Sequence, residues 1–166
     1  IAYSTNGTQW TGLGITLFAF GCYGINYVGN YLMAFGMDNN NSIAYSTNGS
    51  SWTGLGTTLF SVRGNGVANQ SSTTTSGSNI YVAVGQGTNT IIYSTNYGTS
   101  WTGLGTTIFS TSGKGVTNNN SNLWVAVGSG TNTSAYSRNG ITWTTISLFS
   151  SVGYEIESNV SSIYNG

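Results

Sequence analysis

Glu155 and Glu157 are the pair of carboxylates whose spacing could support acid–base chemistry. They stand two residues apart in the stretch GYEIES. Alternate residues of a β-strand share a face, so both could point the same way, as a glycoside hydrolase would need. Such hydrolases hold their carboxylates on separate elements across the substrate, and neighbouring like charges on one strand are typical of a solvated edge. We favour the structural interpretation and expect no catalytic residue.

The other residue types argue against most common reactions. The chain has no His, so the usual general base and the usual zinc ligand are missing, and Cys22 is its one cysteine. Asp38 and the asparagines after it could offer oxygens to Ca²⁺, but a polar loop is the simpler interpretation. The stretch SGKGVT at 112–117 has Gly where a phosphate-binding loop has Ser or Thr after the lysine. We therefore expect no metal and no cofactor.

Charge is scarce throughout the chain. Charged residues make up 4% of the 166 residues, against roughly 25% in an ordinary soluble domain. Three Lys and Arg residues are too few to bind nucleic acid through its phosphates or to attach electrostatically to a membrane. No apolar run has the length of a membrane span, so we expect no membrane insertion. A nearly neutral polar surface does little to prevent association, which predicts contact with a partner.

One short motif is written four times. It reads YSTNGTQW, YSTNGSSW, YSTNYGTSW and YSRNGITW. Its first tyrosines, at 3, 45, 93 and 136, are spaced by 42, 48 and 43 residues. A period of this length is found in blade repeats and in helical-pair repeats.

The pattern within each repeat favours strands. NIYVAVGQG and NLWVAVGSG are short apolar runs that end in glycine, as expected for strands buried on both faces. Asn-Gly in the motif is a strong hairpin signal, because both central turn positions favour positive φ. Frequent glycines would weaken helices at about 1 kcal/mol each. We predict an all-β chain with four antiparallel strands per repeat of about 42 residues, which indicates a β-propeller of about four blades.

The stretch STNYGTSW at 94–101 resembles the Asp-box pattern, with Asn96 in the place of its Asp. The other three copies are one residue shorter. The longer stretch 124–144 is similar to propeller repeats in surface and tail proteins of viruses, phages and bacteria. This resemblance implies a propeller fold. Asp-box sialidases need an arginine cluster, and Arg63 and Arg138 are the only arginines here, so we do not expect that activity.

Residues 1–166 are expected to form a single propeller domain or propeller segment. The chain opens in mid-repeat, which suggests a piece of a longer protein. Its start supplies the third and fourth strands of a blade, and 152–166 supplies material for a first strand or for a first and a second strand. Two arrangements stay open. The ring closes by joining these terminal strands, or the chain is an arc of a larger propeller.

Two sets of residues are candidates for structural and binding roles. The repeated turn residues recur at one position per repeat and are expected to lock hairpins. Tyrosines that break the repeat are better candidates for ligand contacts, as are the divergent stretches 18–38, 69–78 and 150–166. The turn set is Asn6, Gly7, Trp10, Asn48, Gly49, Trp52, Asn96, Gly98, Trp101, Asn139, Gly140 and Trp143; the ligand set is Tyr23, Tyr27, Tyr31, Tyr97 and Tyr154.

These observations favour a non-catalytic structural or adhesive module. Its expected place is extracellular or on a virion, as part of a tail, fibre or appendage. Its expected partners are other protein subunits or surface glycans, in a homo-oligomer or a larger assembly. The alternative is a multivalent lectin, in which each blade offers a shallow sugar site built from aromatic and amide side chains.

Overall fold

The computed structural model describes residues 1–70, 79–120 and 122–157. All strands in this part of the chain pair antiparallel. This part contains no helix, and therefore no helix that is long and apolar enough to cross a membrane. The all-β prediction is therefore confirmed.

The strands form three four-stranded units and one two-stranded half unit. Within each unit, neighbours in sequence are neighbours in the sheet, so the unit is a simple meander. This agrees with four antiparallel strands per repeat. The half unit is β1 (Ala2–Tyr3) and β2 (Thr11–Gly12); the first unit is β3 (Gly21–Val28), β4 (Tyr31–Met37), β5 (Ile43–Ser46) and β6 (Thr53–Gly54); the second is β7 (Arg63–Asn69), β8 (Tyr81–Gln86), β9 (Ile91–Ser94) and β10 (Thr102–Gly103); the third is β11 (Ser112–Asn118), β12 (Trp124–Ser129), β13 (Ser134–Ser137) and β14 (Trp143–Ile146).

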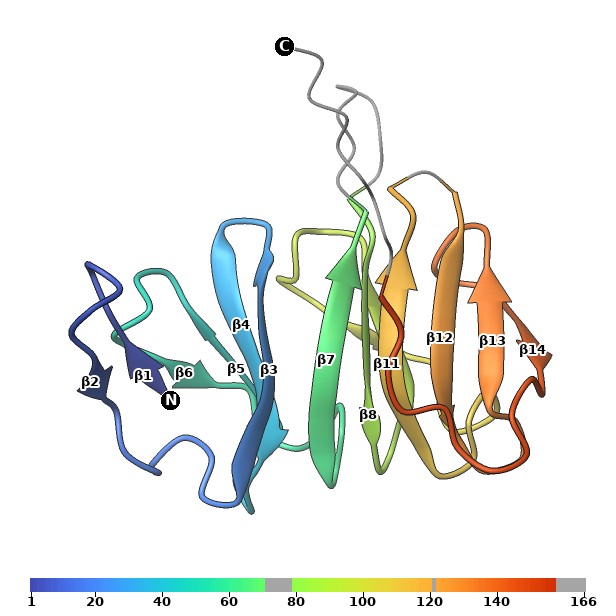
Figure 1. Cartoon of the computed structure of the whole chain (residues 1–166), viewed down its shortest axis with the longest axis horizontal. Helices are drawn as coiled ribbons and strands as arrows, with labels where there is room; N and C mark the ends of the chain where they lie inside the picture. The colour runs from blue at the N-terminus through green and yellow to red at the C-terminus, as the bar shows by residue number, and fades with distance from the viewer. Residues whose placement is uncertain (71–78, 121, 158–166) are drawn as a thin grey trace, which may run out of the picture.

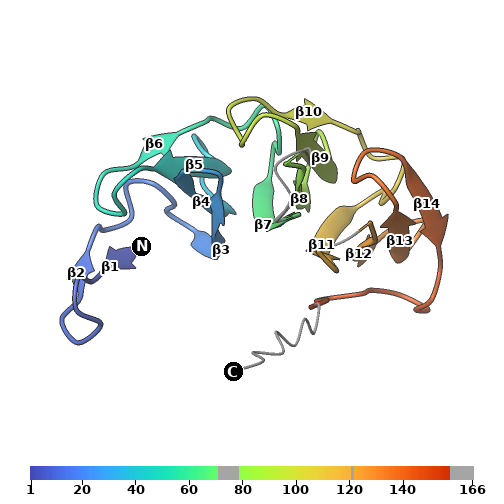
Figure 2. The same cartoon turned by 90° about the horizontal axis from the view of Figure 1, so that it is seen from above.

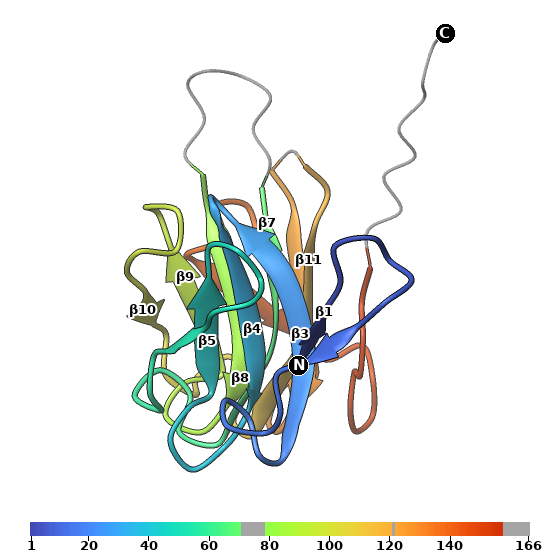
Figure 3. The same cartoon turned by 90° about the vertical axis from the view of Figure 1, so that its left-hand side faces the viewer.

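The units stand side by side in an open arc (Figures 1 and 2). The first strand of each unit lies on the concave side of the arc, and the last lies on the convex side (Figure 2). Seen from the end that carries the half unit, the strands run roughly upright in successive units (Figure 3). A single bridge between Ser112 and Gln86 joins the second and third units into one continuous sheet.

The described ends of the chain do not meet. β1 pairs with β2 at one end of the arc, whereas Val152 forms an isolated bridge with Ser129 at the other end (Figure 2). Val152 thus occupies, beside the third unit, the place that Ser112 occupies beside the second. Residues 158–166, predicted to complete a blade, lie outside the described part. Closure by the terminal strands is not formed among the described residues.

The hydrophobic core lies mainly between successive units. One buried cluster joins the second and third units through Val84, Phe109 and Trp124. A second joins the first and second units through Phe35, Phe60 and Ile92. The second strand of each unit is covered on both faces, which explains why these strands are continuous apolar runs rather than alternating ones.

Each first strand carries a β-bulge at the same point. The register shifts between Cys22 and Gly24 in β3, and at the matching positions of β7 and β11. The extra residue is Tyr23, Asn65 or Lys114. A bulge bends its strand and increases its twist. The first strands also approach closely at the concave side, since a Cβ on Gly24 would lie 3.0 Å from the Asn65 carbonyl oxygen.

Asp38, which follows β4, forms hydrogen bonds that hold the loop preceding β3 in place. Its two carboxylate oxygens accept hydrogen bonds from the backbone N–H groups of Ala19 and Asn40, each at 3.0 Å. The Asn40 bond, followed by the Ala19 bond, holds the pKa of Asp38 below its usual range. These bonds occupy the oxygens that could have served Ca²⁺. The described residues contain no group of three or more His, Cys, Asp or Glu placed to hold a metal.

We expect Asp38→Asn to lower the melting temperature at neutral pH and to flatten its fall in acid. Because the folded-state pKa is depressed, the ionised carboxylate stabilises the fold above about pH 4, the usual Asp pKa, and this contribution disappears as pH falls through the folded-state value. Thermal unfolding followed by circular dichroism from pH 7 to pH 2.5 measures the difference. The two proteins should converge at the acid end; a constant gap at every pH would contradict the assignment.

Candidate functional site

The repeated turns are closed by their own side chains. In the first unit, Ser46 Oγ accepts hydrogen bonds from the N–H groups of Asn48 at 3.2 Å and Gly49 at 2.8 Å. Asn48 Oδ1 then accepts from the N–H groups of Ser50 at 3.0 Å and Ser51 at 2.9 Å. The side-chain oxygen of this asparagine is thereby used to close the turn.

The tryptophan that ends the motif bonds to the same turn in three units. Its indole N–H donates to the carbonyl oxygen of the turn glycine: Trp52 to Gly49 at 2.9 Å, Trp101 to Gly98 at 3.1 Å and Trp143 to Gly140 at 3.2 Å. Trp10, in the half unit, has 65% of its surface exposed. Asn6 and Asn139 close their turns as Asn48 does.

The turn after β9 differs because it contains one more residue. Tyr97 follows Asn96, where the other copies pass directly to glycine. Tyr97 has φ of 61°, in the left-handed region that a bulky residue rarely adopts. Its side chain is 53% exposed. Ser94 and Asn96 still close the turn, with the Gly98 N–H donating to Ser94 Oγ at 3.0 Å and the Ser100 N–H to Asn96 Oδ1 at 3.0 Å.

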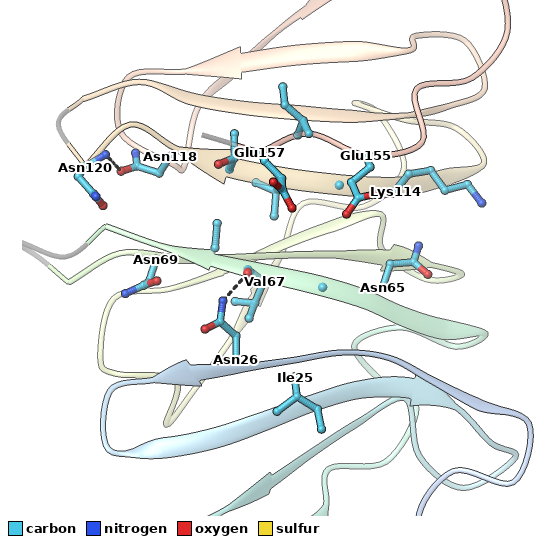
Figure 4. A pocket seen from close by; sticks show the side chains of 16 residues that line it. Ile25, Asn26, Asn65, Val67, Asn69, Lys114, Asn118, Asn120, Glu155 and Glu157 are labelled. Atoms are coloured by element: carbon cyan, nitrogen blue, oxygen red, sulfur yellow. Dashed lines mark hydrogen bonds between the residues drawn. The ribbon is translucent and has the colours of Figure 1, made fainter. Parts of the chain in front are cut away.

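A groove of about 570 Å³ follows the concave side of the arc (Figure 4). It is lined by the first strands of the three units and by residues 155–157. Asn26 Nδ2 donates across it to the Val67 carbonyl at 3.4 Å. Asn65 Nδ2 donates to the Gly113 carbonyl of the next strand at 2.5 Å. We call this feature the concave groove.

Most of the few charges lie in or beside the concave groove. Glu155 and Glu157 come from one exposed segment and point into the groove, whereas Lys114 is directed away from them (Figure 4). Arg63 places its guanidinium carbon 5.2 Å from the centre of the Tyr23 ring, within cation–π reach. Partial burial, and then the Arg63 charge, lower the pKa of Lys114. The two carboxylates share one segment, so they do not face each other across a substrate as in a hydrolase.

Cys22 lies on β3 at the surface. Its thiol is partly removed from water, and this burial raises the pKa of Cys22. The thiol donates a hydrogen bond to the Gly24 carbonyl oxygen, 3.8 Å from Sγ. A raised pKa keeps the thiol protonated at neutral pH. The geometry therefore gives Cys22 little nucleophilic character.

A second cavity of about 570 Å³ lies between the first and second units, which we call the rim pocket. Its lining includes residues of the β3–β4 turn and of the end of β7. Both of these segments lie at the upper edge of the arc in Figure 1. Aromatic and amide side chains from four different segments line it. They are Tyr27, Tyr81 and Tyr97 with Asn30, Asn69, Gln70 and Asn79.

The structure brings together two of the five predicted ligand tyrosines, Tyr27 and Tyr97, in the rim pocket. Tyr31 packs edge-on against Tyr45, with ring centres 5.5 Å apart. Tyr154 lies at the far end of the arc and is 77% exposed. Tyr23 contacts Arg63 instead.

Sequence reasoning missed Tyr81 and Asn79, and it did not single out Asn30 and Asn69 within the predicted stretches 18–38 and 69–78. Tyr81 belongs to the apolar run YVAVG, which predicts a core position, and its side chain is only 5% exposed. Asn30, Asn69 and Asn79 are at strand ends, where asparagine is common for turn geometry alone. The available signal was that Asn30 and Asn69 lie within divergent stretches and that Asn79 directly follows one. Of the stretch predicted for recognition at 69–78, residues 71–78 lie outside the described part, as do 158–166 of the last one.

Comparison with known proteins adds no family to this geometry. No protein-family model matches the chain, and neither does a curated protein or a solved structure. Function must therefore be argued from the concave groove and the rim pocket.

Proposed function

We propose that this chain is a β-propeller-type module that binds without catalysing a reaction. Its four-stranded units correspond to blades, and its role is structural or adhesive, at an extracellular or virion surface. The antiparallel meanders and their arrangement in an arc support the propeller assignment. The open arc supports an incomplete ring over a four-bladed ring closed by its own terminal strands.

The observation that carries the binding role is the concave groove. It offers amide side chains and backbone polar groups along three adjacent first strands, so an extended polar chain can make repeated hydrogen bonds there. Both a polysaccharide and a polypeptide segment have this form. The low charge of the chain supports recognition by hydrogen bonds and stacking in preference to ion pairing.

The rim pocket supports the lectin alternative with one change, a single sugar site in place of several. In its original form, that alternative predicts one shallow sugar site in each repeat. The inserted Tyr97 occurs in one turn only, and the positions equivalent to Tyr81 are Leu32 and Trp124. The rim pocket therefore supports one distinct site, between the first and second units.

Filling the concave groove tests the proposal. A Cβ on Gly66 would meet no atom within 4 Å, so Gly66→Tyr should fold while placing a ring in the groove. Binding to an array of oligosaccharides and soluble polysaccharides, with analysis of products, should show saturable binding without cleavage. We expect the variant to bind at least about tenfold more weakly, a loss of about 1.4 kcal/mol.

Gly12→Tyr is the matched control, because a Cβ on Gly12 also meets no atom within 4 Å and lies on β2, outside the groove. It should bind as the parent chain does. Release of shortened glycans would contradict the non-catalytic role. An adhesive role would also be contradicted by a chain that binds no glycan and stays monomeric at high concentration in sedimentation experiments.

A further inference from the structure

The rim pocket has the chemistry of a site for a neutral sugar. We propose that it binds one uncharged pyranose unit of a glycan, with Tyr97 as the stacking platform. This inference rests on the proposed function, since it specifies one of the glycan contacts of an adhesive module. Its volume of about 570 Å³ lies within the range of about 300–1,000 Å³ found for small-molecule sites.

Tyr97 is held in a costly conformation that the turn itself does not need. The other three copies of the motif close without this residue. Tyr97 combines a positive φ of 61° with a side chain that is 53% exposed. Backbone strain of this kind persists where a function uses it. An exposed ring at the mouth of a cavity is the form that stacking on a sugar face requires.

The neighbouring unit makes room for this ring. A Cβ on Gly29, in the β3–β4 turn, would lie 2.8 Å from Tyr97 Cβ, so only glycine fits there. The Gly29 N–H in turn donates to the Tyr81 hydroxyl oxygen at 3.0 Å. The inserted Tyr97 therefore fits closely against Gly29 in the β3–β4 turn of the preceding unit, and both residues line the pocket.

Tyr81 is placed to donate a hydrogen bond into the site. Its hydroxyl oxygen accepts from Gly29, which leaves the hydroxyl hydrogen for a ligand oxygen. Burial raises the pKa of Tyr81, so the hydroxyl stays protonated. The Tyr81 and Tyr97 ring centres are 6.5 Å apart at 49°. The rings are therefore not stacked on each other.

Four amides, those of Asn30, Asn69, Gln70 and Asn79, complete the polar lining. The side chains of Asn30, Asn69 and Asn79 are exposed or half-buried, and within the described part of the chain these three form no hydrogen bond. An amide both donates and accepts, which suits the adjacent hydroxyl groups of a sugar ring. Among the described residues, no charged side chain lines the pocket. A carboxylate or phosphate on the ligand would therefore find no cation, which favours neutral sugars over sialylated or phosphorylated ones.

The test uses the whole chain and two variants that keep the fold. Tyr97→Gly suits the positive φ, and deletion of Tyr97 restores the shorter turn of the other three copies. The control is Phe20→Ala, an aromatic side chain with 61% exposure just before β3, at the opposite end of that strand from Tyr27. Thermal unfolding of each variant confirms that it is folded.

The probes are an array of neutral hexose, deoxyhexose and N-acetylhexosamine oligosaccharides, their sialylated forms and a polyproline peptide. The best-bound neutral oligosaccharide is then titrated by calorimetry. We expect both Tyr97 variants to lose at least about tenfold in affinity for it and Phe20→Ala to retain its affinity. Undiminished binding by the Tyr97 variants would overturn the inference. So would the absence of neutral-sugar binding, a preference for sialylated forms, or tighter binding of polyproline.

Gly66→Tyr, titrated in parallel, separates this inference from the proposed function. If the groove variant loses glycan binding while both Tyr97 variants keep it, the glycan occupies the concave groove and the rim pocket is not the site. If the Tyr97 variants alone lose binding, the rim pocket is the site and the concave groove is not needed for glycan contact.

Discussion

Replacement of Phe109 by alanine is expected to lower the free energy of unfolding by about 3–5 kcal/mol. Phe109 is fully buried between the second and third units. Its ring lies flat against the backbone of β12, because a Cβ on Gly128 would be only 2.6 Å from the ring carbon Cγ. Truncation removes buried apolar surface and leaves a cavity between two four-stranded units that cannot both relax into it.

Urea unfolding followed by circular dichroism measures this loss, and Phe20→Ala provides the comparison. Phe20 is 61% exposed, so its truncation should change stability by less than about 0.5 kcal/mol. Equal effects of the two substitutions would show that Phe109 does not join the two units.

Gly128→Ala should destabilise the chain by about 1–3 kcal/mol or more, through overpacking. The added methyl group would clash with the Ser112 carbonyl oxygen and would lie 2.6 Å from the Phe109 ring. The first of these neighbours is backbone, which cannot turn aside as a flexible side chain could. The expected loss is therefore caused by close approach, not by an unusual backbone conformation.

Gly66→Ala is the matched control for this second prediction, because a Cβ there meets nothing within 4 Å. It should alter the free energy of unfolding by no more than about 0.5 kcal/mol. The double variant Phe109→Ala/Gly128→Ala should lose less than the sum of the single changes, since removing the ring frees part of the space. Strict additivity would argue against direct contact between the two residues.

The repeat unit could be predicted from the sequence because its signals are local. The run YVAVG predicts a strand buried on both faces, and Asn48-Gly49 predicts the turn that the structure shows. The number of blades could not be predicted in this way. Ring closure depends on contacts between segments more than a hundred residues apart, and no local propensity encodes them.

The binding surfaces were only partly predictable for a related reason. Tyr97 was detectable because its insertion breaks the repeat. Tyr31 breaks the repeat equally, yet it packs against Tyr45. The sequence predicts a core position for Tyr81, but its hydroxyl group accepts a hydrogen bond from the Gly29 N–H at the pocket. Whether an aromatic side chain packs or protrudes depends on its neighbours in space, which lie in the same unit for Tyr31 and in the adjacent unit for Tyr81, and a single-repeat pattern does not contain that information.

The buried clusters lie mainly between units. The stability of each unit therefore depends on its contacts with the adjacent units. A unit with no neighbour exposes the apolar faces of its second strand, so no unit is an autonomous folding domain. Free energy accumulates with each added interface, as in a one-dimensional cooperative array. The smallest cluster, built on Phe18, Ala34 and Ala44, joins the half unit to the first unit. Local opening should therefore start at β1 and β2 and progress inward, and the interface between the second and third units should open last.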